Sequence, residues 1–142
     1  ESMQAINAAN TGHSVITTIH ANSCEDTYYR MVTLCKQEQP GMDDTTLQNL
    51  ATKAFPIVAF AKRLEDNSRR IMEITECETL QDGRKKMRTL YRFNITDNII
   101  VEGKPKIIGH YEKVENLSED LQKRLRENGL PLKMQEQLLA KR

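Results

Sequence analysis

The sequence predicts an α/β fold made of three consecutive parts. Residues 1–54 combine helical patterns with one short β-branched segment, which predicts helices around a buried strand. Residues 55–101 contain strand-like runs separated by turn signals, which predicts an antiparallel three-stranded meander. Residues 102–142 are polar and end in helical patterns, which predicts a C-terminal helical tail. A chain of 142 residues is long enough for one domain holding all three parts.

The first part begins with a helix and a strand. Residues 1–10 carry apolar side chains at helical spacing, and Gly12 is expected to end that helix. The segment Val15–Ile19 is rich in β-branched residues, which pack well on a pleated surface. We therefore expect a buried strand over 15–21, with His20 at its carboxyl end.

Two more helices are expected before the meander. Ser23 is a good N-cap, and it precedes a helix that runs to about Gln37. Pro40-Gly41 is a turn signal that ends this helix. The pattern of apolar side chains then predicts a helix over Thr45–Ala54.

The meander is expected to contain strands over 55–61, 69–80 and 85–95, with turns at 64–68 and at Asp82-Gly83. The first of these is a continuous apolar run, which favours a strand buried on both faces. Alternation in the third predicts that one face carries four apolar side chains: Met87, Tyr91, Phe93 and Ile95.

The last part begins after a further turn predicted at Asp97-Asn98. Residues 104–117 are polar, and we expect them to be weakly ordered. A helix is predicted over Ser118–Asn128, since Ser118 can cap it and Gly129 can end it. A final amphipathic helical segment is predicted over 133–141.

Composition narrows the function classes. The net charge is +1, which gives no general reason to expect nucleic acid as a ligand. The three cysteines are odd in number and form no CxxC pair, so reduced thiols are expected rather than a zinc site or disulfides. Residue 1 is Glu and already lies in a helical pattern, from which we infer a piece of a longer protein.

The two histidines near the start of the chain are the first candidates for chemistry. A histidine at a strand end beside a phosphate site can donate a hydrogen bond to a γ-phosphate or to an attacking water. His20 fits that description, although a structural histidine at a turn would leave the same pattern for His13 and His20. On a strand their seven-residue gap would separate the rings by about 20 Å, too far to share a metal ion.

Arg30 and a basic run supply the other candidates. An arginine on a helix surface can enter a neighbouring subunit's phosphate site and stabilise charge, or it can simply be solvated. Arg84–Arg88, continued by Arg92, could touch anionic lipid or nucleic acid, but cross-strand pairing with Glu73, Glu76, Glu78 and Asp82 is the simpler account. The sequence contains no GxxxxGK[ST] phosphate loop.

These motifs together resemble one family. Thr11-Gly12-His13, the apolar segment and then Thr18-Ile19-His20-Ala21-Asn22 resemble the histidine box of the secretion-superfamily ATPases. The similarity continues through four further stretches: Arg30, Phe55–Leu64, Asp66–Ile71 and Ile74-Thr75-Glu76. Ile108-Gly109 and the leucines up to Gly129-Leu130 resemble the tail of the CpaF-like branch, whereas the histidine spacing is closer to the pilus-retraction and type II branches.

The resemblance implies the C-terminal part of a RecA-like P-loop ATPase domain, without the phosphate-loop and acidic magnesium-site segments. It implies catalytic roles for His20 and Arg30 and nucleotide contacts from Gly12, His13, Thr18 and His20, with no metal ligand in this part. The full-length protein would use ATP and Mg²⁺, and this part alone would bind neither and would be inactive.

The same resemblance implies partners, location and role. The full-length protein would form a homo-hexamer at the cytoplasmic face of the membrane and contact an inner-membrane platform protein, with no direct nucleic-acid ligand. It would energise type II or type IV secretion, pilus assembly or conjugation. The alternative from the residues themselves is a non-catalytic interaction domain that docks on a membrane protein or nucleic acid through the basic run.

Overall fold

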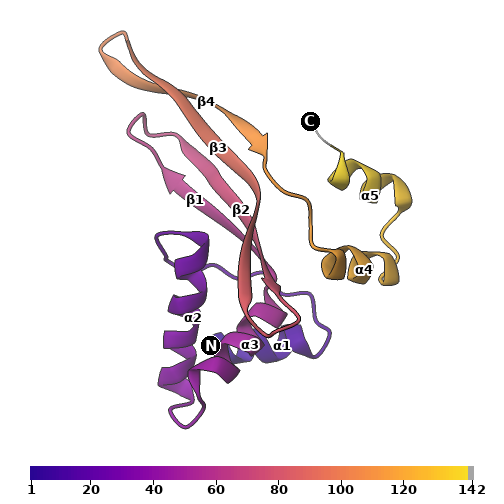
Figure 1. The fold of residues 1–142 in the computed structure, drawn as a ribbon. Helices are drawn as coiled ribbons and strands as arrows, with labels where there is room; N and C mark the ends of the chain where they lie inside the picture. Colours follow the sequence, from indigo (N-terminus) through magenta and orange to yellow (C-terminus); the bar gives the residue numbers. More distant parts are fainter. Residues whose placement is uncertain (141–142) are drawn as a thin grey trace.

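The computed structural model of the chain describes residues 1–140 and confirms an α/β fold (Figure 1). Helices α1 (Ser2–Asn10), α2 (Cys24–Glu38) and α3 (Asp44–Ala54) gather at one end of the molecule. An elongated sheet rises from them, and helices α4 (Glu119–Glu127) and α5 (Leu132–Leu139) lie beside it. Within the described residues, no helix is both long enough and apolar enough to cross a membrane.

The three N-terminal helices pack into a small core of their own. Ser23 caps α2 by accepting a hydrogen bond from the Asp26 amide at 3.0 Å, and Asp43 caps α3 by accepting one from the Thr46 amide at 2.9 Å. The helices bury one shared cluster of side chains: Met3, Ile6, Met31, Cys35, Leu47 and Ala51. The structure confirms the helices predicted in residues 1–54, including the cap predicted at Ser23.

The predicted strand over 15–21 is wrong. In the structure this segment has no regular secondary structure, and the Ile16 side chain is 98% exposed. β-Branched residues favour a strand, but a strand also needs a hydrogen-bonded neighbour, and residues 1–140 supply none here. The segment runs instead as a connection between α1 and α2.

The sheet has four strands rather than the three that we predicted. They are β1 (Ile57–Arg63), β2 (Arg69–Thr79), β3 (Lys85–Val101) and β4 (Lys104–Lys113), antiparallel and in the order β1-β2-β3-β4. Because residues 104–113 are largely polar, we predicted a weakly ordered segment. In the structure they form β4, which pairs along its length with residues 91–101 of β3.

The turn predicted at Asp97-Asn98 is also wrong. β3 continues through these residues to Val101, and the chain reverses at Glu102-Gly103, where φ is 50° and 73°. Two successive residues with positive φ make the tight turn whose twist matches a β-hairpin. The glycine of that turn is therefore the signal that the sequence reading missed.

β1 is an edge strand, which corrects the prediction that it is buried on both faces. Its residues alternate between half-buried and exposed, and Ile57 is 40% exposed. Only β2 pairs with it. An apolar run therefore lies at an open sheet edge, where burial would require another element.

A register shift also changes which side chains share a face of β3. Between Ile74 and Thr75 of β2 the pairing shifts, and Leu90 of β3 is the extra residue. Because a strand alternates faces, the shift places Met87 and Tyr91 on opposite faces, not on one face as predicted. Leu90 itself is buried.

The tail is fixed to the sheet by polar contacts. Glu76 of β2 is 3% exposed, and its carboxyl group accepts hydrogen bonds from the amide of Ser118 at 2.8 Å and from the Ser118 hydroxyl. Ser118 in turn caps α4 through the Leu121 amide at 3.1 Å, which confirms the predicted cap. The last predicted segment, 133–141, corresponds to α5, and residue 141 lies outside the described residues.

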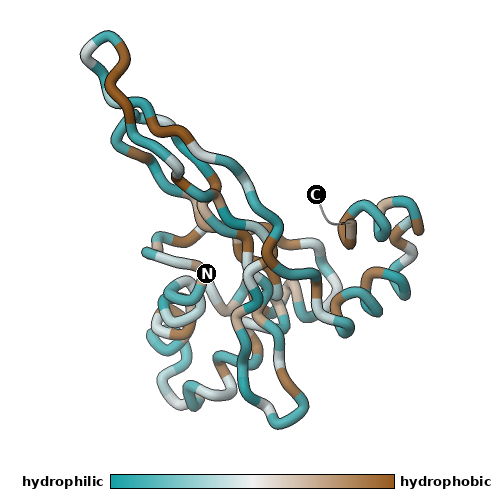
Figure 2. Tube along the Cα trace, turned by 45° about the horizontal axis from the view of Figure 1, so that its top comes forward, coloured by the Kyte–Doolittle hydropathy of each residue, from teal (hydrophilic) through white to brown (hydrophobic). Residues whose placement is uncertain are grey.

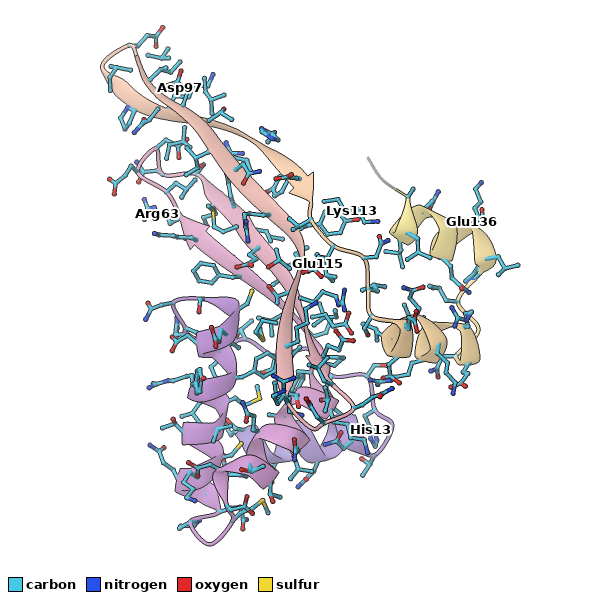
Figure 3. All side chains as sticks on the ribbon, in the orientation of Figure 1. His13, Arg63, Asp97, Lys113, Glu115 and Glu136 are labelled. Atoms are coloured by element: carbon cyan, nitrogen blue, oxygen red, sulfur yellow. The ribbon has the colours of Figure 1, made fainter. Side chains whose placement is uncertain are left out.

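The basic run is largely paired, as the simpler account predicted. Arg88 bonds to Glu78 at 2.6 Å and to Glu115 at 3.0 Å, and the Glu78 carboxyl group raises the pKa of the guanidinium. Figure 3 shows Glu115 where the chain leaves the sheet. Arg84 pairs with Asp82. Glu76 instead accepts hydrogen bonds from Ser118 and pairs with no basic residue of this run. The run is therefore part of the scaffold.

Candidate functional site

An open groove of about 850 Å³ lies between the irregular segment 15–22 and strand β1. On one side it touches eight consecutive residues, 15–22, and on the other five consecutive residues of β1, 57–61. Consecutive residues of a strand point to alternate faces, so contact with all five indicates that the groove runs along the free edge of β1. No strand among residues 1–140 pairs with the backbone groups of that edge on the groove side.

Three of the residues predicted for the site come together in this groove. Thr18 and His20 belong to the segment wall, and Arg30 reaches the groove from α2. All three are exposed, so each can meet a ligand or another chain. The capping of α2 by Ser23 places Arg30 about two turns into the helix, on the groove side.

The other two predicted residues lie elsewhere. Gly12 has φ 97°, a conformation that favours glycine, and it forms the turn after α1. The amide of His13 donates to the Ala8 carbonyl at 3.1 Å, and its Nδ1 lies 3.4 Å from the Thr11 hydroxyl. Neither residue lines the groove, and Figure 3 shows His13 on the loop beside the N-terminal helices. His13 therefore belongs to the turn, which separates it from His20.

Tyr28 of α2 is buried and lines the groove, and Cys24 lies nearby in the same helix. The Tyr28 hydroxyl donates to the Phe55 carbonyl, and burial raises the pKa of Tyr28. Cys24 places its Sγ 3.7 Å from the Val58 carbonyl oxygen, and burial raises the pKa of its thiol as well. Both side chains thus stay protonated near neutral pH. Tyr28 ties α2 to the end of α3 and Cys24 ties it to β1, and a protonated thiol is a poor nucleophile.

The groove has hydrogen-bonding edges but lacks the parts that would hold a phosphate chain. No GxxxxGK[ST] motif occurs in the sequence. Within residues 1–140, no group of three His, Cys, Asp or Glu side chains is placed to hold a metal ion. His20 and Arg30 can donate hydrogen bonds to an anion, but they need another element to position it.

Comparison with protein families identifies what kind of chain builds this groove. The family model described as type II/IV secretion system protein matches residues 1–140. The chain belongs to this family. A comparison with curated proteins finds no match.

Membership of the type II/IV secretion family confirms the resemblance to the secretion-superfamily ATPases. Members of this family are typically ATPases that use ATP and Mg²⁺. They generally oligomerise and act with membrane platform proteins. The groove with His20 and Arg30 is therefore the part of this chain to examine for nucleotide chemistry.

Sequence reasoning missed one whole wall of the groove. It treated the apolar run of β1 as core, whereas residues 57–61 line the site. The apolar run itself was the available signal. Such a run can belong to an interior strand that pairs on one side with a strand from another part of the protein. Only the strand order shows that this neighbour is not within residues 1–140.

Proposed function

We propose that this chain is the C-terminal part of a RecA-like ATPase domain in a motor that energises type II or type IV secretion, pilus assembly or conjugation. The groove between segment 15–22 and β1 supports this assignment more than any other feature. It has an unpaired strand edge on one wall and a β-branched segment on the other. A strand from a preceding part of the same protein, followed by its phosphate loop, would fit between them.

Insertion of such a strand would explain two of the sequence predictions that failed. Segment 15–21 would gain the neighbour that its β-branched residues require, and β1 would become an interior strand with both edges paired. In open α/β sheets, ligands bind at the carboxyl ends of the strands. His20 lies at that end of its segment, so it would stand beside a phosphate held by the inserted strand's loop.

Each groove residue then has a distinct role. His20 would donate a hydrogen bond to the γ-phosphate or to the attacking water. Arg30 would offset negative charge as the phosphoryl group is transferred, in its own site or in that of a neighbouring subunit. Thr18 would contact nucleotide beside His20, while Gly12 and His13 would fix the turn that aims the segment.

ATP and Mg²⁺ would be held mainly by the other half of the site. The family chemistry is phosphoryl transfer to water, and Mg²⁺, when bound, would supply positive charge that stabilises the phosphates. The full-length protein would form a ring of six at the cytoplasmic face of the membrane, against a platform protein. The basic run would not bind nucleic acid, since its arginines are paired with carboxylates.

Replacement of His20 in the full-length protein tests this function. We expect His20→Ala to lower kcat for ATP hydrolysis by about 100-fold or more, while nucleotide affinity stays within a few-fold. His110→Ala is the matched control, because that histidine is exposed on β4, outside the groove, and its loss should leave kcat nearly unchanged. Equal turnover in His20→Ala and wild type would refute the assigned role.

The second measurement uses the chain of 142 residues by itself. It should hydrolyse no ATP, because the phosphate loop is absent from its sequence. Hydrolysis that follows the purified chain through successive columns and disappears in His20→Ala would show that the site is complete here, contrary to the proposal.

A further inference from the structure

The β3–β4 hairpin forms an arm that projects beyond the rest of the sheet (Figure 1). Its tip, residues 99–104, reverses at Glu102-Gly103. Ile100 is 70% exposed and Val101 is 43% exposed. Figure 2 shows the hydrophobic stretch at the end of the arm. Large apolar side chains at the point farthest from the body of a molecule indicate contact with another surface.

The same sheet carries an apolar hollow of about 290 Å³. Six residues line it: Ile71, Glu73, Ile74, Tyr91, Phe93 and Tyr111. The Phe93 and Tyr111 rings lie 5.0 Å apart at 58°, and Tyr111 remains 56% exposed. A binding site for a small molecule usually combines apolar walls with several polar groups that point at the ligand. With a single charged residue in the lining, this hollow suits an apolar side chain of another protein better than a small ligand.

The tip cannot reach the hollow of its own molecule. Seven positions separate Phe93 from Ile100, which is about 23 Å along a strand. Both residues are paired with β4, Phe93 with Tyr111 and Ile100 with Pro105, so the arm is a paired hairpin between them, with one register shift between Ile95 and Asp97. Any contact between an apolar tip and an apolar hollow of this sequence must therefore join two molecules.

The charges at the end of the arm disfavour a lipid surface as its target. Residues 97–106 carry Asp97, Glu102, Lys104 and Lys106, which sum to zero. An anionic membrane would gain little from this arrangement, and insertion of the apex would take the Glu102 carboxylate out of water. A protein surface can accept the apolar side chains and leave those charges in solvent at the rim.

We propose that the β3–β4 tip of one copy docks into the hollow of a second copy. The chain supplies both halves of the contact, and an arm from one molecule entering a site on the next is a heterologous contact that builds rings or open chains. This contact uses neither the groove nor His20, so it goes beyond the proposed nucleotide function and does not depend on it.

Disulfide trapping in the full chain tests the contact directly. One variant carries Val101→Cys on the tip and a second carries Ile71→Cys in the hollow, where both side chains are partly exposed. The three native cysteines are buried, so they give little background. We expect a mixture of the two variants to form a cross-linked dimer at least about tenfold faster than either variant alone.

The control variant is Gln81→Cys, which lies exposed near the β2–β3 turn, another hairpin end. A mixture of Gln81→Cys with Ile71→Cys should cross-link no faster than either alone. Cross-linking of Val101→Cys mainly with itself would overturn the proposal in favour of tip-to-tip contact. Equal rates in all mixtures would overturn it in favour of random collision.

Sedimentation of the full chain gives a second, independent readout. Ile100→Asp should weaken self-association by about tenfold or more, because one branched aliphatic side chain loses its burial. Gln81→Asp adds the same charge at another exposed position and should change association little. Unchanged association in Ile100→Asp, or loss of binding to phosphatidylserine vesicles as its only effect, would refute docking between copies.

Discussion

The carboxyl group of Glu76 carries the attachment of the tail to the sheet. It is buried in β2, and it receives both the amide and the hydroxyl of Ser118 just before α4 begins. A buried polar group is costly when a partner is removed, because the group left behind is desolvated without compensation. This one residue therefore links two elements that share few apolar contacts.

Replacement of Glu76 by glutamine should test that link. Gln retains one acceptor oxygen but turns its amide group toward a donor, so we expect Glu76→Gln to lower the free energy of unfolding by about 1–3 kcal/mol. Glu65 is exposed near the β1–β2 turn, and Glu65→Gln should change stability by less than about 0.5 kcal/mol. Urea denaturation measures both. Similar midpoints for the two variants would contradict the assigned role of Glu76.

The two histidines show what residue spacing can and cannot establish. In the sequence, either His13 or His20 could be a structural histidine at a turn, and His20 was preferred for the phosphate site because of its expected place at a strand end and the family resemblance. The structure separates them, since His13 is held in the turn after α1 while His20 lines the groove. The difference arises from which side chains of distant segments lie nearby, which spacing along the chain does not encode.

At the level of elements, the β3–β4 hairpin depends on one glycine. Gly109 lies opposite Ile95, and the Phe93 ring crosses over it. A Cβ atom at this position would lie 2.6 Å from Cζ of Phe93 and would collide with the Asn94 carbonyl. The close approach explains why a small residue stands in the middle of a long strand, where glycine is otherwise unfavourable.

Gly109→Ala should accordingly destabilise the fold. The ring or the strand must move to make room, which costs about 1–3 kcal/mol in the free energy of unfolding. Gly41→Ala is the matched control, because no atom lies within 4 Å of a Cβ there, and its stability should stay the same or rise slightly. Thermal unfolding of both variants checks this, and an unchanged Tm in Gly109→Ala would show that Phe93 moves aside freely.

The elements themselves were predictable to different degrees. Helices were found because their apolar side chains recur at helical spacing, and α2, α3 and α4 also begin at a capping side chain: Ser23, Asp43 and Ser118. β4 was missed because its polar residues hide the pattern, and β3 was cut short because Asp97-Asn98 resembles a turn. A strand is stabilised by its neighbours, so local sequence specifies it less completely than it specifies a helix.

At the scale of the whole molecule, the packed core of α1, α2 and α3 contrasts with the groove, where one edge of β1 is not paired with another strand of residues 1–140. The side chains of α1, α2 and α3 form a buried core, whereas within residues 1–140 no backbone hydrogen bond joins segment 15–22 to β1 across the groove. This arrangement predicts that the same residues behave differently in the 142-residue chain and in the full-length protein.

Hydrogen exchange should detect the difference. Amides of residues 15–20 lie outside any ladder, so they should exchange rapidly in the 142-residue chain. In the full-length protein an inserted strand should slow them by about 100-fold or more, since opening would then cost about 3 kcal/mol. Amides of β2 should be protected in both proteins and serve as the reference. Rapid exchange of residues 15–20 in both would argue against strand insertion.

The sequence by itself determined the helices, the order of the parts and the family resemblance, and it pointed to His20 and Arg30 as candidates for the site. These depend on caps, on periodicity and on motifs a few residues long, all of which act locally. The tertiary structure decided the fourth strand, the edge position of β1, the irregular path of segment 15–21 and the separation of His13 from the groove. Each of these depends on a partner distant in sequence, whose presence or absence no local pattern records.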